Sequence, residues 1–354
     1  MRLRGVVYDV GTVFRGPGWS IPTRPTLDMA VARREIGIIR DDLHCTAVKI
    51  TGHDLRRVSA AAEEALRRDL DVWLGPTFFE GSPDQTVQYF LAAADVAEKL
   101  RHRFPERVTL IMGGELSLFM QGIIPGRAIT ERLTNMFQSV RAGDLACHDR
   151  LNAFLARASG AVREVFHGPL TYASLMGERV DWHPFDIVGV DHYREARVKD
   201  RYVAMLEPLL ALGKPVVVTE FGMRTFAGAE SSGALGFGIA DSRSQWLHSL
   251  PLVGRFFRVR LRPGDWVRDE DLQARELSDT LAILDQAGVE GAFVSEFVTP
   301  EAPHRATPGY DVDMSAMSLV KSYERQRGRT YPDMAWEPKK SFWAVAEAYA
   351  AHTT

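Results

Sequence analysis

The chain has 354 residues, of which 45% are hydrophobic and 25% charged, a composition typical of a globular protein with a large core. Its formal net charge of −3 gives no reason to expect nucleic acid or an anionic membrane as a partner. No run of about 18 apolar residues predicts a membrane span, and the first residues lack the apolar stretch of a signal peptide. We therefore expect a cytoplasmic protein.

The cysteines and histidines argue against a bound metal or cofactor. Cys45 and Cys147 cannot form a disulfide framework, and neither lies in a metal-binding spacing. No two histidines lie at ligand spacing on one predicted strand. The glycine-rich run at 233–238 lacks the preceding strand and following helix of a dinucleotide-binding loop. We therefore expect no metal and no cofactor.

Short apolar runs alternate with helical patterns along the chain. The predicted strands cover residues 3–8, 45–50, 70–75, 108–113, 170–173, 186–190, 216–219 and 291–295. Helices are expected between them, including one at 202–212, and helical patterns continue from residue 314 to 349. Asp54 and Ser82 stand at N-cap positions before two of these helices. Eight strands alternating with helices predict a (β/α)8 TIM barrel, formed by a single domain over 1–354.

The longest connection lies between the seventh and eighth predicted strands. Residues 223–269 form this insertion, which is rich in glycine and contains Trp246 and Trp266. Long loops in compact domains are usually functional or mobile. We therefore interpret the insertion as a lid or small subdomain within the barrel domain.

Several of the predicted strands end in, or are followed by, an acidic residue. In a (β/α)8 barrel the carboxyl ends of all strands meet on one face, so acids at these ends are expected to be neighbours. Asp191 and Tyr193 also fall on the same face of the sixth strand, which directs the Tyr193 hydroxyl toward the carboxylate ending the seventh. The acids expected in the shared site are Asp9, Glu115, Asp191, Glu220 and Glu296.

Aromatic residues near the strand ends are candidates for contact with a sugar ring or another flat ligand. Packing in the core or at the rim is an equally good interpretation of each one alone. His192 lies between Asp191 and Tyr193 and is counted as a candidate for substrate binding; if it points away from Tyr193, it is a core residue. The aromatic candidates are Tyr8, Trp73, Phe119 and Tyr172.

Three strand ends carry a resemblance to a known family. Glu115 in GGELSLF, Tyr193 in FDIVGVDHY and Glu220 in VVVTEFG resemble the large clan of retaining glycoside hydrolases with a (β/α)8 barrel. The resemblance implies that Glu115 is the general acid/base, that Glu220 is the nucleophile and that Tyr193 hydrogen-bonds the nucleophile. That clan usually has an asparagine before the acid/base, which contacts the sugar 2-hydroxyl, and this chain has Gly114.

The whole-chain pattern also resembles actinobacterial proteins labelled abortive-infection proteins. The segments that carry this second resemblance are LHCTAVKITG, GGELSLF, FDIVGVDHY and YPDMAWEPKKSF.

Paired carboxylates define the predicted chemistry. Two close carboxyls do not both ionise easily, so one is expected to hold a proton near neutral pH while the other stays charged. The sequence therefore predicts a glycosidase-like enzyme that acts on a small intracellular glycoside through Glu115 and Glu220. Two alternatives stay open, namely acid/base-catalysed cyclisation or rearrangement of a non-sugar metabolite, and a non-catalytic carbohydrate-binding barrel. The oligomeric state is also open.

Overall fold

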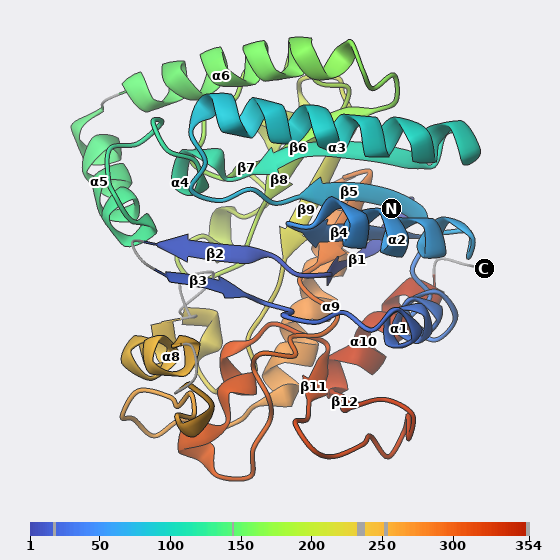
Figure 1. Cartoon of the computed structure of the whole chain (residues 1–354), viewed down its shortest axis with the longest axis vertical. Coiled ribbons are helices and arrows are strands. Elements are labelled where there is room, and N and C mark those ends of the chain that lie inside the picture. Colours follow the sequence, from blue (N-terminus) through green and yellow to red (C-terminus); the bar gives the residue numbers. More distant parts are fainter. Residues whose placement is uncertain (17–18, 144, 232–237, 251–253, 352–354) are drawn as a thin grey trace.

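Eight parallel strands close into a barrel at the centre of the molecule (Figure 1). The structure is a computed structural model that describes residues 1–16, 19–143, 145–231, 238–250 and 254–351. Around the barrel the strands follow the order β1, β10, β9, β8, β7, β6, β5, β4. Their bounds are β1 (Leu3–Asp9), β4 (Ala47–Gly52), β5 (Asp71–Pro76), β6 (Val108–Gly114), β7 (Leu170–Leu175), β8 (Val188–Asp191), β9 (Val216–Phe221) and β10 (Gly291–Val294).

Helices follow all of these strands except β7, which leads to β8 without one, and the predicted (β/α)8 barrel is confirmed. Asp54 caps α2, and Ser82 forms a capping box with Gln85 at the start of α3, as the sequence predicts. The helices are α1 (Met29–Asp41), α2 (Leu55–Leu66), α3 (Pro83–Arg103), α4 (Leu116–Phe119), α5 (Ile129–Ala142), α6 (Ala146–Arg163), α7 (Glu207–Leu210), α8 (Ser242–Ser249), α9 (Glu270–Gln286) and α10 (Lys340–Ala350).

Alternation along the strands separates two apolar layers. One buried cluster fills the barrel interior with side chains from alternate strand positions. The intervening residues, such as Val6, Val48 and Val218, belong to a larger cluster between the strands and the helices. The interior cluster consists of Leu3, Val7, Ala47, Trp73, Ile111, Ala173, Val217 and Phe293.

Three segments differ from the sequence-based expectation. The loop after β1 contains an antiparallel hairpin, β2 (Val13–Gly16) and β3 (Trp19–Pro22). The helix expected at 202–212 is reduced to α7, with Pro208 in its first turn. Within the expected helical pattern at 314–349, only α10 is an α-helix, and β11 (Val320–Ser322) pairs with β12 (Trp336–Pro338).

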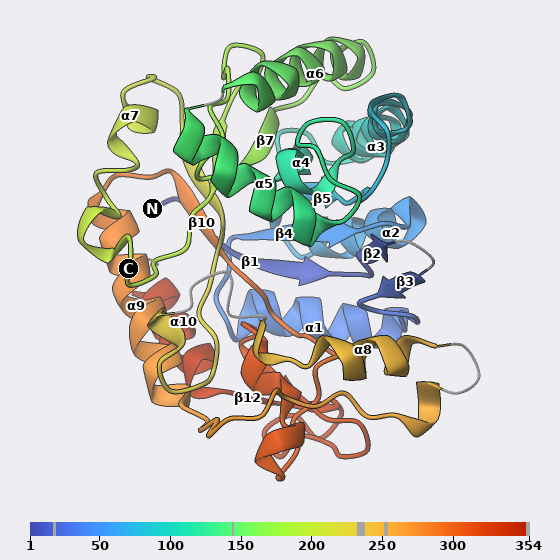
Figure 2. The same ribbon diagram turned by 90° about the vertical axis from the view of Figure 1, so that its left-hand side faces the viewer.

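The predicted insertion lies between β9 and α9 and contains α8. Its two limbs meet at antiparallel bridges, one joining Phe226 to Arg268 and the other Ala240 to Leu261. Residues 232–237 and 251–253 of the insertion lie outside the described residues. Figure 2 shows α8 below the β2–β3 hairpin and α5 above it, on the side where the barrel strands end. That the insertion acts as a lid stays a prediction.

No helix among the residues described above is long and apolar enough to cross a membrane.

Candidate active site

A one-residue register shift in β9 turns Glu220 toward the barrel axis. Val218 pairs with Val190 of β8, but Glu220 pairs with Asp191, and a matching shift occurs against β10. Strict alternation would send Thr219 inward and Glu220 outward. The extra residue lets both face the interior, and Phe221 returns to the outer apolar layer.

The Glu220 carboxylate has hydrogen-bond donors from three other strands or the residues that follow them. Oε1 accepts from the Tyr193 hydroxyl at 2.5 Å and from the Ser295 hydroxyl at 3.0 Å. Oε2 lies 3.3 Å from Nζ of Lys49. The Glu220 side chain is still 28% exposed, so a ligand can reach it. The site therefore holds this carboxylate in a fixed orientation and leaves part of it open.

Lys49 is a cation in direct contact with the Glu220 carboxylate, and its side chain is only 6% exposed. Its Nζ also lies 4.0 Å from Oδ1 of Asp191 and donates to the backbone oxygen of Thr219 at 3.2 Å. Burial alone would lower the pKa of Lys49, but the charges of Asp191 and Glu220 raise it. Lys49 is therefore a fixed positive charge among the carboxyls.

Asp191 lies beside Lys49 and faces the end of β6. Thr219 Oγ1 donates to its Oδ1 at 2.6 Å, whereas none of the described residues donates to Oδ2. A Cβ added to Gly114 would lie 3.8 Å from that free oxygen. Burial and the charge of Glu220 raise the pKa of Asp191 to about 7, although Lys49 acts in the opposite direction. Asp191 therefore offers one unpaired oxygen where Gly114 leaves space.

Glu115 reaches the same site from the end of β6, again after a register shift. Ile111 pairs with Thr171 of β7, but Gly114 pairs with Ala173. Gly113 lies at the shift with φ +77°, and a Cβ there would be 2.8 Å from the Phe90 ring, so the position favours glycine. Glu115 itself has a left-handed backbone (φ 48°, ψ 40°) just before α4.

The two glutamates differ in proton affinity. Burial raises the pKa of Glu115 well above its usual range, and the charges of Asp191, Glu220 and Glu178 raise it further. Burial also works against the charged form of Glu220, but Lys49 and the hydrogen bonds from Tyr193 and Ser295 lower its pKa below the usual value. One carboxyl therefore favours its proton while the other favours its charge.

Asp9 and Glu296 lie at the same end of the barrel in an adjoining acidic group. Asp9 accepts hydrogen bonds from Thr12 Oγ1 at 2.7 Å and Thr51 Oγ1 at 3.1 Å, so it anchors the start of the β2–β3 region. Thr299 donates to Glu296 at 2.9 Å. Burial and the charges of Glu301 and Asp9 raise the pKa of Glu296 well above its usual range, and Glu220 contributes in the same direction.

Four predicted substrate-binding residues lie elsewhere. Tyr8 and Tyr172 point to the outer apolar layer, because they neighbour the inward-facing Asp9 and Ala173. Trp73 is inside the barrel but packs on Phe293 with ring centroids 5.2 Å apart, in the buried layer. All three are at most 2% exposed. We therefore remove them from the set of residues expected to contact a substrate.

His192 is the fourth. Its ring stacks on Tyr202 with centroids 3.8 Å apart, and Nε2 donates to the Tyr202 backbone oxygen at 2.9 Å. Burial lowers the pKa of His192 to about 4. His192 is thus a neutral core residue. It points to the outer layer because its neighbour on the strand, Asp191, faces the barrel interior. Phe119, by contrast, is half-buried and stacks on Phe79 with centroids 4.2 Å apart, so it stays a candidate.

Sequence reasoning missed Lys49, Ser295 and Glu178. Lys49 carried a signal, since a lysine within the buried run AVKIT requires a charged partner. Ser295 and Glu178 carried none, because a serine after a strand and a glutamate in a loop are common on any surface. Among the described residues, no group of three or more histidine, cysteine, aspartate or glutamate residues is arranged to hold a metal.

Comparison with solved structures shows the class of fold on which this site is built. The chain is similar to a GH113 β-1,4-mannanase, with a TM-score of 0.59, 13% identity and 99% of each chain covered. It is also similar to the GH113 β-mannanase AaManA from Alicyclobacillus acidocaldarius, with a TM-score of 0.57, 15% identity, and 99% of this chain and 97% of that chain covered.

A third similar structure is PbGH5A, a glycoside hydrolase family 5 enzyme from Prevotella bryantii B14. The TM-score is 0.53 at 11% identity, covering 98% of this chain and 96% of that chain. No protein-family model matches the sequence, and no curated protein matches it. At these identities the likeness shows the (β/α)8 barrel fold alone and leaves the reaction to be argued from the site. The resemblance to abortive-infection proteins stays a prediction.

Proposed function

We propose that the protein hydrolyses a small glycoside with retention of anomeric configuration, with Glu220 as nucleophile and Glu115 as general acid/base. The observation that carries the proposal is the contrast between the two carboxyls. Glu220 accepts hydrogen bonds from Tyr193, Ser295 and Lys49, which favours a charged nucleophile. Among the described residues none donates to the Glu115 carboxyl, so its proton is available to a leaving group.

In the first step Glu220 attacks the anomeric carbon while Glu115 transfers its proton to the departing glycosidic oxygen. The product is a covalent glycosyl ester on Glu220 and a free alcohol. In the second step Glu115, now ionised, removes a proton from water, which attacks the same carbon and releases Glu220. Tyr193 and Ser295 hold Oε1 throughout, and Lys49 balances the charge that returns when the ester breaks.

Asp191 is the proposed ligand of a substrate hydroxyl next to the reacting carbon. Its unpaired Oδ2 faces the space at Gly114, close to where the related clan usually has an asparagine side chain. A carboxylate accepts hydrogen bonds strongly, and the interaction with a sugar hydroxyl can strengthen in the transition state. A glycine at position 114 is then compatible with glycoside chemistry, because Oδ2 of Asp191, instead of an asparagine side chain, would bind the sugar hydroxyl.

A mechanism-based 2-fluoro glycoside tests the assignment of the nucleophile. A panel of chromogenic aryl glycosides would first identify a turned-over sugar, and its 2-fluoro derivative would then be incubated with the protein. We expect one covalent adduct, located on Glu220 by peptide mass spectrometry, and neither turnover nor adduct in Glu220→Gln. An adduct that persists in that variant would contradict the assignment. Acid/base chemistry on a non-sugar metabolite predicts no adduct on Glu220 with any glycoside.

A further inference from the structure

The backbone around Glu115 is held by an unusual arrangement of caps. Glu115 occupies the N-cap position of α4, where a side chain normally accepts a hydrogen bond from the first turn of the helix. Its own side chain makes no such bond. Because the first N–H groups of a helix have no partner within it, other groups must accept them.

Those acceptors come from β7 and the loop that follows it. The Glu115 N–H donates to the Ala173 oxygen at 2.9 Å, and the Leu116 N–H donates to the Tyr172 hydroxyl at 2.7 Å. The Ser117 N–H donates to Oε1 of Glu178 at 3.1 Å, and the Ser117 hydroxyl donates to the same oxygen. Three consecutive N–H groups are therefore bound by one neighbouring segment.

Glu178 is itself fixed by a complete set of donors. Its Oε2 accepts from the Tyr172 hydroxyl at 2.8 Å and from the Leu175 N–H at 2.9 Å. Since Tyr172 accepts from Leu116, its hydroxyl proton is free to point at Glu178. Both oxygens act only as acceptors, which is the pattern of an ionised carboxylate. Burial raises the pKa of Glu178, and the donors from Ser117 and Tyr172 oppose that shift.

We propose that Glu178 and Tyr172 are positioning residues that cap α4 in place of Glu115 and so leave the Glu115 carboxyl free to exchange a proton with substrate. This inference rests on the proposed function, since it assigns the two residues to the control of the acid/base. The inference also gives a role to the Tyr172 hydroxyl, which lies in the outer layer and therefore cannot reach a substrate at the barrel axis.

The clamp of Glu178 and Tyr172 acts on Glu115 in two separable ways. The hydrogen bonds orient the backbone of Glu115, and the negative charge of Glu178 disfavours a second negative charge on Glu115. Glu178→Gln removes the negative charge and replaces one acceptor oxygen by an NH2 group, which cannot accept from the two donors that faced that oxygen. Tyr172→Phe removes the hydroxyl that joins Leu116 to Glu178 and keeps the charge of Glu178. The titratable groups that face Glu115 are Lys49, Tyr172, Glu178, Asp191, Tyr193 and Glu220.

Steady-state kinetics of the Glu178→Gln and Tyr172→Phe variants test the clamp. In Glu178→Gln we expect kcat to fall by up to about 100-fold with little change in KM, because a misplaced acid/base mainly affects the transition state. The alkaline limb of the pH profile should also move to lower pH, since a Glu115 of lower pKa loses its proton sooner. Tyr172→Phe should lower kcat by a smaller factor and leave the limb in place.

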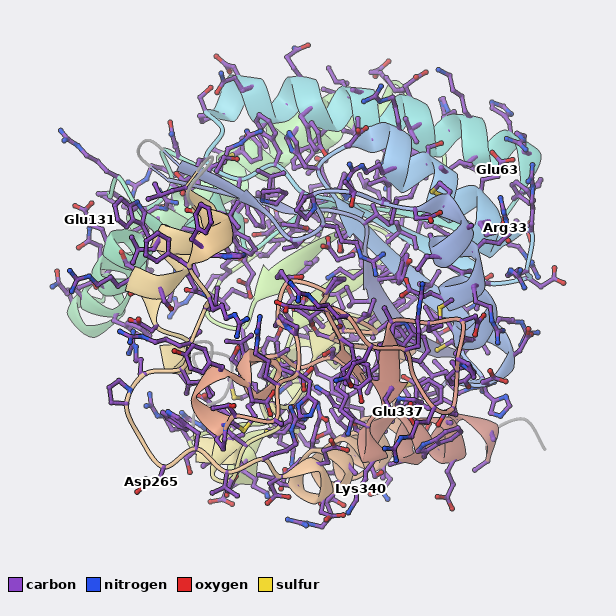
Figure 3. The ribbon with its side chains drawn as sticks, turned by 60° about the horizontal axis from the view of Figure 1, so that its bottom comes forward. Arg33, Glu63, Glu131, Asp265, Glu337 and Lys340 are labelled. Carbon is purple, nitrogen blue, oxygen red and sulfur yellow. The ribbon has the colours of Figure 1, made fainter. Side chains whose placement is uncertain are left out.

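Two control variants remove comparable groups elsewhere. Glu337→Gln affects a carboxylate that accepts from the N–H groups of Arg329 and Thr330, in the loop before β12 (Figure 3). Tyr349→Phe removes a buried hydroxyl that donates to the Gly5 oxygen. Both should leave kcat and the pH limb unchanged. Thermal unfolding of all four variants would show that each one folds.

Carboxyl ¹³C NMR of glutamate-labelled protein, with Glu115→Gln to assign the signal, measures the Glu115 titration without any substrate. A Glu115 signal that titrates at lower pH in Glu178→Gln than in the unchanged protein supports the clamp, even if no glycoside is hydrolysed and the proposed function fails. An unchanged titration in folded Glu178→Gln would overturn the clamp, even if glycosidase activity is established. An unchanged kcat in both Glu178→Gln and Tyr172→Phe of an active enzyme would overturn it as well.

Discussion

The hydrogen bonds around Glu220 end on its carboxylate, whereas those around Glu115 end on its backbone and on the two residues that follow it. Both side chains lie at the same end of the barrel, and both follow a register shift in their strand. A nucleophile has to keep a charge in a fixed direction, and an acid/base has to gain and lose a proton. The difference shows how one site can support both tasks: direct hydrogen bonds stabilise the charge of one carboxyl, and indirect ones position the other.

Among the variants proposed, those that remove the Glu115 or the Glu220 carboxyl should have the largest effect on activity. For an alkyl glycoside, Glu115→Gln is expected to lower kcat/KM by roughly 10²–10⁴-fold, because the leaving oxygen receives no proton. For a dinitrophenyl glycoside, whose leaving group needs no proton, the first step should be nearly unaffected. Glu220→Gln is the matched control and should abolish turnover of both. An equal loss for both leaving groups in Glu115→Gln would contradict its role as the acid.

Lys49→Met should change the proton affinity of Glu220, the second carboxyl of the site. Lys49 lowers the pKa of Glu220, so its removal should raise that pKa. Activity depends on the charged form of Glu220, and the acidic limb of kcat/KM should therefore move to higher pH, so that the rate falls at pH values just below the limb. Lys49→Arg keeps the charge and should leave the limb near its original position.

The same variant has a thermodynamic signature. Lys49→Met leaves the buried Asp191 and the partly buried Glu220 close together without the charge of Lys49, and breaking a buried ion pair typically costs about 3–5 kcal/mol in the free energy of unfolding at neutral pH. Both carboxyls would then have folded-state pKa values above their unfolded ones, so the loss should shrink as the pH falls and they take up protons. Urea unfolding at pH 8 and pH 5 measures this, and an equal loss at both would contradict it.

The barrel and its strands could be predicted from the sequence, because buried parallel strands appear as short apolar runs with β-branched residues. The convergence of the acids followed from the topology alone. The register shifts in β6 and β9 could not be predicted, since they depend on how neighbouring strands pair. Simple alternation would have pointed Glu220 outward if Thr219 faced the interior.

Alternation also contained information that the sequence-based list of aromatic residues did not use. Asp9 and Asp191 face the barrel axis, so Tyr8 and His192 beside them had to face outward. Glu178 could not be found from the sequence at all, because its role depends on the contact between the loop after β7 and the first turn of α4. Positions along a strand were thus easier to predict than contacts between loops.

Tyr8→Phe should have the smallest effect on activity, because Tyr8 faces away from the site that contains Glu115 and Glu220. The Tyr8 hydroxyl donates to Glu35 at 2.5 Å and accepts from Arg24 at 2.9 Å, both on the outer side of the barrel. We expect kcat and KM to stay within about twofold, and the free energy of unfolding to fall by about 1–3 kcal/mol, since a buried hydrogen-bond partner is lost. A raised KM with unchanged stability would instead place the ring against the substrate, and would contradict the outward direction that alternation gives to this residue.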